Sequence, residues 1–231
     1  MQGRLYGIGV GPGDPELLTI KAINTIKDCD VIAVPKAGQA ERTACSIVAH
    51  YLEGKSLLEC SFSMDRDEDT RIASRKAAAA KVIAYLDKGS KVGFITLGDP
   101  TTYSTYMYLQ DIIVSQGYEA TIVPGITSYA AAAAAFGMAL CEGDETLTII
   151  PGKHSEDLAE LLDHPGNKVL MKSGSNLQKT LEILKQRGLA HNTRIATRVT
   201  MSDERLYTSI EDYERSPEAG YFTIALVKED R

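Results

Sequence analysis

Short runs of β-branched and other apolar residues alternate with longer segments rich in Ala, Leu, Lys and Glu along the 231 residues of the chain. Short apolar runs are typical of buried strands, and the longer segments are typical of helices. The first half predicts strands at 5–10, 31–34, 57–62, 92–96 and 120–123, with helices at 17–27, 43–52, 68–88 and 103–116. The second half predicts strands at 147–150, 169–172, 193–199 and 221–227, with helices at 127–136, 155–163, 176–187 and 209–215. This alternation indicates an α/β fold with a mostly parallel sheet covered by helices.

The length of the chain fits either one large α/β unit or two compact halves. No sequence repeat relates the halves, and no Ser/Gly-rich linker separates them. The second half repeats the rhythm of the first, and we place the boundary between them near 117–124. We therefore expect an N-terminal domain over 1–118 and a C-terminal domain over 119–231.

The charge balance is acidic, with 25 Lys and Arg against 31 Asp and Glu and a net charge of −6, which excludes a basic nucleic-acid clamp. No window approaches the roughly 18 apolar residues of a membrane helix, and the first residues do not read as a signal peptide. The 4 cysteines form no CxxC pair, and the 4 histidines have no ligand spacing. We expect a cytoplasmic protein that binds neither nucleic acid nor membrane and holds no metal of its own.

The first predicted strand leads into a glycine-rich segment, GIGVGPGD at 7–14. Such a turn between a strand and a helix lets the backbone approach a ligand closely. The segment is not a dinucleotide fingerprint, because Pro12 or Asp14 takes the place of the third glycine, depending on where the count begins. It therefore predicts either another kind of binding loop or a plain structural turn.

Two further loops follow predicted strands, LGDPTTYS at 97–104 and VPGITS at 123–128. In open parallel sheets, ligands bind beyond the carboxyl ends of the strands. The alternative is helix capping, with Asp99 as the N-cap and Pro100 as the first helical residue. Three such loops in one chain favour a shared site over three independent caps.

Together with VLMK at 169–172, these motifs resemble those of the tetrapyrrole methylases, the S-adenosylmethionine-dependent enzymes of cobalamin and sirohaem synthesis. The resemblance covers nearly the whole chain. It implies two αβα domains with mostly parallel or mixed sheets, an active-site cleft between them that takes S-adenosylmethionine, and a homodimer. Within the family, the segments 98–109 and 141–147 are most similar to the C20-methyltransferases of precorrin-2 or cobalt-factor II. The sirohaem branch would carry Gly-Arg-Gly where this chain has Tyr-Ser-Thr at 103–105.

The resemblance also assigns the residues around S-adenosylmethionine. Carried over motif by motif, they are Pro12, Leu97, Gly98, Asp99, Thr102, Thr127, Ser128 and Met171. Carbonyls and a carboxylate suit a sulfonium, hydroxyls suit the polar tail of the donor, and a Met side chain suits the adenine face, although Met171 alone also fits an ordinary core. Asp99 is the only acid within a donor motif that could take a proton, so it is the candidate catalytic residue, with holding its loop as the alternative role.

A tetrapyrrole edged with carboxylates requires local positive charge on this acidic protein. The candidate substrate-binding residues are Lys36, Tyr103, Lys153, His154 and Arg198. Each cation is also compatible with an ordinary solvated surface. Three alternative functions remain open. The protein could methylate another position of a tetrapyrrole, or it could be a methyltransferase of the same fold that acts on protein, as diphthine synthase does, or on ribosomal RNA. The third alternative is a non-catalytic module that binds the donor. The sequence leaves open whether the acceptor carries cobalt.

Overall fold

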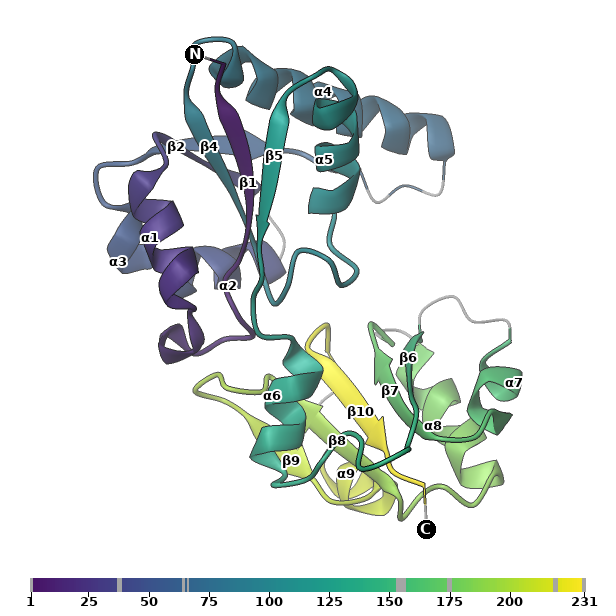
Figure 1. Cartoon of the computed structure of the whole chain (residues 1–231). Helices are drawn as coiled ribbons and strands as arrows, with labels where there is room; N and C mark the ends of the chain where they lie inside the picture. The colour runs from purple at the N-terminus through teal and green to yellow at the C-terminus, as the bar shows by residue number, and fades with distance from the viewer. Residues whose placement is uncertain are drawn as a thin grey trace. The chain divides into compact units, whose positions relative to one another are not determined.

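The computed structural model describes residues 2–36, 39–63, 65, 67–152, 157–173, 176–217 and 220–229. The chain forms two compact units, Met1–Thr127 and Ser128–Arg231 (Figure 1). Each unit is a sheet with helices on both faces, which confirms the predicted α/β class and the αβα layering.

The first unit contains a five-stranded sheet in which every neighbouring pair is parallel. Its strands are β1 (Arg4–Gly9), β2 (Val31–Pro35), β3 (Ser56–Cys60), β4 (Lys91–Thr96) and β5 (Glu119–Val123). The order across the sheet is β3-β2-β4-β1-β5, so β1 lies between β4 and β5. Because all the strands are parallel, their carboxyl ends lie at one edge.

Two hydrophobic clusters cover the two faces of this sheet. One cluster packs Ile8 and Ile32 against Leu18, which follows the short helix η1 (Pro15–Leu17), and against α1 (Ile20–Asp28), α2 (Gln39–Ile47) and α3 (Ala49–Leu52). The other packs Leu5 and Phe94 against α4 (Glu68–Leu86) and α5 (Tyr106–Ser115). Alternate residues of β1 point to opposite faces, as the period of a strand requires.

The boundary between the units lies after Thr127 rather than after residue 118. β5 pairs with β1 along its length, from Arg4 opposite Glu119 to Ile8 opposite Val123. Strand pairing therefore assigns 119–123 to the first unit, and the predicted domains 1–118 and 119–231 divide the chain too early.

The second unit has a mixed sheet in the order β6-β7-β10-β8-β9. Its strands are β6 (Leu147–Pro151), β7 (Asn167–Met171), β8 (Thr193–Thr197), β9 (Arg205–Tyr207) and β10 (Thr223–Val227). β6 and β7 are parallel, whereas β10 is antiparallel to both β7 and β8, and β9 is antiparallel to β8. The prediction of a mostly parallel sheet, made from the alternation of segments, is thus confirmed for the first unit. The second unit has a mixed sheet, which the family resemblance also allowed.

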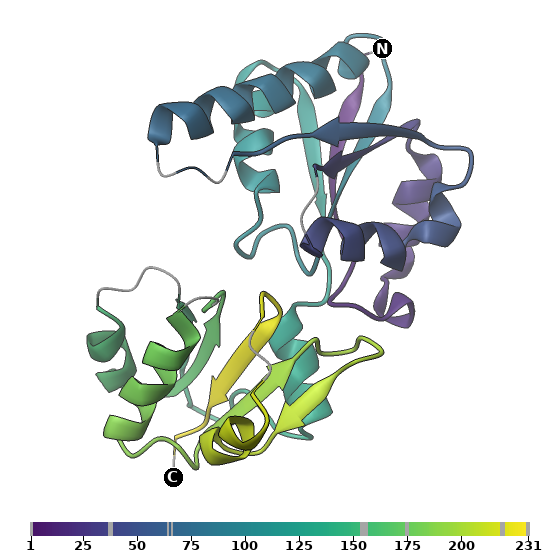
Figure 2. The same ribbon diagram turned by 180° about the vertical axis from the view of Figure 1, so that it is seen from behind.

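One face of the second sheet carries α7 (Leu158–Asp163), α8 (Leu177–Gln186) and α9 (Ile210–Arg215), which share a core with Leu170 and Ile195. The opposite face carries α6 (Ser128–Ala135), as Figures 1 and 2 show from two sides. α6 is almost entirely alanine, and Ala131, Ala132 and Ala133 are buried. Small side chains let this helix pack closely.

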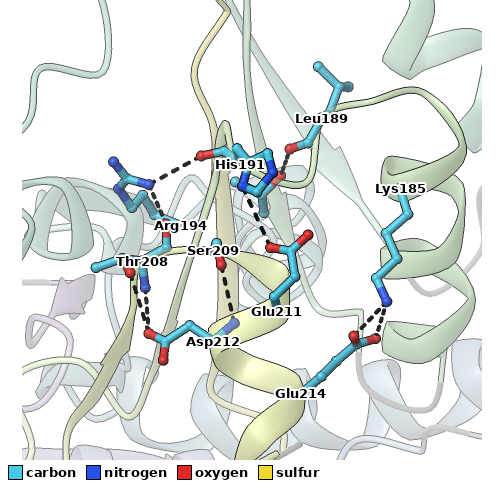
Figure 3. A network of polar contacts seen from close by, with 10 residues as sticks. Lys185, Leu189, His191, Arg194, Thr208, Ser209, Glu211, Asp212 and Glu214 are labelled. Atoms are coloured by element: carbon cyan, nitrogen blue, oxygen red, sulfur yellow. Dashed lines mark hydrogen bonds and ion pairs between the residues drawn. The ribbon is translucent and has the colours of Figure 1, made fainter.

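Polar contacts fix the second sheet at the edge opposite the carboxyl ends of β7 and β8. At the start of α9, the side chain of the N-cap Ser209 accepts a hydrogen bond from Asp212 N at 3.1 Å, and the Asp212 carboxylate accepts one from Thr208 N at 3.0 Å (Figure 3). Lys185 of α8 donates to Glu214 of α9 at 2.5 Å. These contacts join α8 to α9 and cap the start of α9 at this edge.

Two predicted helices differ from the structure, and one short strand was missed. The helix expected over 103–116 begins at Tyr106, because Tyr103 has a φ of 51°, which no helix can include. The helix expected over 43–52 is broken at Val48 into α2 and α3. The short strand β9 was not predicted. Within the described residues, no helix combines the length and apolar character needed to cross a membrane.

Candidate active site

The two central strands of the first sheet, β1 and β4, are neighbours whose following segments leave toward opposite faces. The chain passes from β1 to α1 on one face, and from β4 to α5 on the other. Such a divergence leaves a crevice beyond the carboxyl ends, where ligands of open α/β sheets bind. The three loops singled out in the sequence follow β1, β4 and β5, so they all lie at this edge.

The loops after β1 and β4 are joined by their backbones. Gly98 N donates to Gly11 O at 2.8 Å, and Gly11 N donates to Gly98 O at 3.3 Å. Gly98 has a φ of 71°, which favours glycine. A Cβ added at Gly98 would meet Ile126 O at 4.0 Å, with no closer neighbour among the described residues, so this stretch of backbone has space beside it. A ligand can approach the peptide groups here directly.

The loop after β5 is packed against the same backbones. A Cβ on Gly9 would lie 2.6 Å from Gly125 N and 2.7 Å from Gly98 O. A Cβ on Gly125 would in turn collide with Gly98 O. Three glycines from three loops therefore touch without side chains between them.

Asp99 connects two of these loops through its carboxylate. Its Oδ2 accepts a hydrogen bond from Gly125 N at 2.9 Å, and its Oδ1 accepts one from Thr101 N at 2.8 Å and another from the Thr101 hydroxyl. The residue is 8% exposed. The alternative role of Asp99 as a helix N-cap is not found, because α5 begins seven residues later, at Tyr106.

The far end of the loop after β4 is held by Ser104 and Tyr106. The hydroxyls of Thr96 and Ser104 are 2.9 Å apart, and Ser104 Oγ accepts from Tyr106 N at 3.2 Å. The Tyr106 ring is fully buried against Gly7, where any Cβ would overlap it, and burial raises the pKa of this phenol. The first glycine of the segment 7–14 thus makes room for a core tyrosine. Sequence reasoning missed this role, although a large residue opening a helix beside a glycine-bearing strand is a usable signal.

The residues assigned to S-adenosylmethionine fall in both units. The first unit brings six of them together on its three loops: Pro12, Leu97, Gly98, Asp99, Thr102 and Thr127. Ser128 is the first residue of α6, and Met171 is the last residue of β7, so these two belong to the second unit. The six residues of the first unit lie on loops at one edge of its sheet, and their contact with S-adenosylmethionine stays a prediction.

The carboxyl ends of β6, β7 and β8 share one edge of the second sheet, since β7 and β8 are both antiparallel to β10. Gly152 N donates to Met171 O at 2.9 Å, which joins the loops after β6 and β7. Directly after β7 and β8, Lys172 and Arg198 have φ values of 57° and 50°. Left-handed backbone is costly for residues with side chains and is concentrated at functional sites.

The candidate substrate-binding residues differ in their surroundings. Lys36 follows β2 and is exposed, with its backbone N donating to Cys60 O at 2.6 Å. Tyr103 is 41% exposed, and partial burial raises the pKa of its phenol. Arg198 forms an ion pair with Asp203 in the loop between β8 and β9. Lys153 and His154 lie outside the described residues.

The described parts of the chain contain no group of three His, Cys, Asp or Glu side chains placed to hold a metal ion. Of the four cysteines, Cys29 and Cys60 are buried, and burial raises the pKa of Cys60 to about 11. These two thiols are core residues.

Comparison with known proteins agrees with the motifs. The family model of the tetrapyrrole (corrin/porphyrin) methylases matches residues 4–213. The chain is 35% identical, over 97% of its length and 96% of the relative's, to a probable cobalt-precorrin-2 C(20)-methyltransferase of Methanocaldococcus jannaschii. It is 32% identical to a precorrin-2 C(20)-methyltransferase of Sinorhizobium sp, over 97% of this chain and 95% of that one.

A solved structure shares the fold. The uroporphyrin-III C-methyl transferase of Thermus thermophilus complexed with S-adenosylhomocysteine has a TM-score of 0.73 and 20% identity, with 98% of each chain covered. The family model spans nearly the whole chain and includes the three loops at the carboxyl edge of the first sheet. The chain therefore belongs to the tetrapyrrole methylase family.

Proposed function

We propose that this protein is an S-adenosylmethionine-dependent C-methyltransferase that adds one methyl group to C20 of precorrin-2 or its cobalt-containing counterpart in cobalamin biosynthesis. Family membership supports the reaction class, and the two curated relatives support the acceptor and the position. The single structural observation that carries the proposal is the junction of the loops after β1, β4 and β5 at the switch point, with space beside Gly98.

The residues present fit the methyl donor. The backbone around Gly98 offers peptide groups to a ligand without an intervening side chain, and Thr102 and Thr127 add half-buried hydroxyls. Met171 is half-buried and suits an adenine face. When bound, S-adenosylmethionine supplies an electrophilic methyl group on sulfur. The protein's part is to orient the donor, and the hydrogen bonds that hold the loops after β4 and β5 support this role.

The acceptor side requires cations and a surface for a large ring. We assign Lys36, Tyr103 and Arg198 to it, together with Lys153 and His154. The reduced macrocycle is itself the nucleophile: a carbon–carbon bond forms at the meso carbon, the carbon–sulfur bond breaks, and a proton then leaves the methylated carbon. Residues that hold ring carboxylates decide which carbon lies in line with the methyl group at about 3–3.5 Å.

We further propose a cytoplasmic homodimer, an expectation that rests on the family resemblance. Light scattering of the purified protein would distinguish a dimer near twice the chain mass of 25.1 kDa from a monomer.

The activity is tested with carbon-labelled S-adenosylmethionine and four acceptors in parallel: metal-free precorrin-2, its cobalt form, uroporphyrinogen III, and a protein and ribosomal RNA extract. We expect one added methyl group on a dimethylated acceptor, with an NMR signal at the meso carbon C20. A signal at a pyrrole β-carbon would overturn the position. Label in protein or RNA alone would overturn the acceptor class, and comparison of the first two acceptors decides whether cobalt is required.

A further inference from the structure

Asp99 is the acidic side chain at the centre of the loops that carry the proposed function. Its two carboxylate oxygens accept three hydrogen bonds, from Thr101 N, the Thr101 hydroxyl and Gly125 N. The residue is 8% exposed. We propose that Asp99 is a positioning residue that holds the loop after β5 against the loop after β4 and so forms the donor site, and that it does not take the proton released in the reaction.

The geometry of the carboxylate supports this role. Oδ1 bonds within its own loop, and Oδ2 reaches across 26 positions of sequence to the loop after β5. A hydrogen bond between a carboxylate and a backbone N–H is among the stronger ones in proteins. A proton on either oxygen would compete with these bonds and loosen the contact between the loops. A group whose ionised form supports the site is poorly suited to change its charge during turnover.

The packing around Gly125 explains why the contact matters for the donor. Gly125 is wedged against Gly9 and the Gly98 carbonyl, where no Cβ fits. The Asp99 carboxylate also accepts a hydrogen bond from the N–H of this residue, so packing and a polar contact together hold the Gly125 backbone. Thr127, which is assigned to the donor, lies two residues further along. The position of that hydroxyl therefore depends on the Asp99 carboxylate.

The inference rests on the proposed function, and Asp67 provides a matched control for it. Asp67 is the N-cap of α4, and its Oδ2 accepts from Thr70 N at 2.8 Å and from the Thr70 hydroxyl at 2.6 Å. This is the same pairing that Asp99 makes with Thr101, but on a solvent-exposed helix end. Asp67→Asn removes a carboxylate of this kind without touching the three loops.

The experiment measures S-adenosylhomocysteine binding by calorimetry, and kcat and the KM for S-adenosylmethionine with the tetrapyrrole acceptor. For Asp99→Asn we expect Kd and the donor KM to rise about tenfold or more, with kcat at saturating donor within about threefold of the wild type. Asp67→Asn is expected to change none of them. Amide exchange at Gly125, followed by NMR, is expected to accelerate only in Asp99→Asn.

The opposite split would overturn the inference: a large fall in kcat with unchanged Kd means that Asp99 handles the proton. Unchanged kcat and Kd would also overturn it. If Asp99→Asn does not fold, Thr101→Val removes one partner of the carboxylate, and a rise in Kd supports the role while an unchanged Kd contradicts it. Failure of the wild type to bind S-adenosylhomocysteine would count against the proposed function itself, which separates the two claims.

Discussion

The two sheets present different chemistry at the edges where their strands end. In the first sheet this is the edge at which β1, β4 and β5 end, and in the second it is the edge at which β6, β7 and β8 end. The first edge is made of glycines and hydroxyls, and its loops are joined by backbone hydrogen bonds and the buried Asp99. The second carries Met171 and two cations in left-handed backbone, Lys172 and Arg198. The first edge thus leaves backbone open to close approach beside Gly98, and the second presents residues with long side chains.

This difference predicts how each edge responds to substitution. Where backbone touches backbone, an added carbon has no space and disturbs three loops at once. Where a long side chain reaches into solvent, its removal subtracts one interaction and leaves the scaffold intact. The predictions below test this contrast.

The largest effect is expected for Gly125→Val. Its side chain would collide with the Gly98 carbonyl and with Gly9, and relief requires movement of the loops after β1 and β4. We expect a loss of about 3 kcal/mol in the free energy of unfolding and no measurable donor binding. Denaturant unfolding and calorimetry measure these two quantities.

The matched control for this change is Gly54→Ala. Gly54 has a φ of 73° but nothing within 4 Å of an added Cβ, so its substitution tests backbone strain alone. We expect it to cost about 1 kcal/mol and to leave donor binding unchanged. Retained donor affinity in a folded Gly125→Val protein would mean that the three loops do not form the donor site.

The next largest loss of stability is expected at the ion pair between Lys168 and Glu229 in the second unit. Lys168 is 1% exposed and pairs at 2.7 Å with Glu229, whose side chain is 39% exposed. Because the buried member of the pair is the lysine, Glu229→Gln is expected to cost about 3 kcal/mol, as it leaves an ammonium group without its counter-ion. Lys168→Met is expected to cost only about 1 kcal/mol, since Glu229 can still reach water and accept from Gly166 N.

Acid unfolding provides a second readout of this pair. The hydrogen bond from Lys168 holds the pKa of Glu229 below its ordinary value of 4.5. A lowered folded-state pKa contributes stability above the unfolded value, and that contribution is lost as the pH falls below about 4.5. Both variants should therefore lose less stability than the wild type on acidification. Equal destabilisation by the two variants at neutral pH would contradict the larger cost expected for Glu229→Gln. As a control, donor binding should be unchanged in both variants.

The sequence predicted the order of strands and helices because apolar runs and helical periodicity are local properties. It also located the loops at 97–104 and 123–128, since turns leave a local signal in Gly, Pro and Asp. It missed that Gly7 accommodates Tyr106, although the glycine in the strand and the large residue opening the helix were a usable signal. It could not predict that Asp99 bonds to Gly125, because this contact joins two loops 26 positions apart in the chain. The short strand β9 was missed for a related reason: its pairing with β8 depends on the tertiary fold.

The smallest effect is expected at Arg198, where charge and backbone strain can be separated. Its side chain is 42% exposed and pairs with Asp203, an exposed ion pair of a kind that adds little to stability. Arg198→Ala removes the charge but keeps the left-handed backbone, so the free energy of unfolding should change by less than about 0.5 kcal/mol. Arg198→Gly removes both, and relief of the strain at a φ of 50° should stabilise the protein by about 0.5–1 kcal/mol relative to Arg198→Ala.

If Arg198 holds a carboxylate of the acceptor, both variants should raise the acceptor KM by about fivefold and leave the Kd for S-adenosylhomocysteine unchanged, whereas Asp203→Asn should not raise that KM. Steady-state kinetics at varied acceptor, beside denaturant unfolding, measures both effects. An unchanged acceptor KM in both Arg198 variants would remove this cation from the substrate site, and equal stability of the two would show that the left-handed conformation carries no strain at this position.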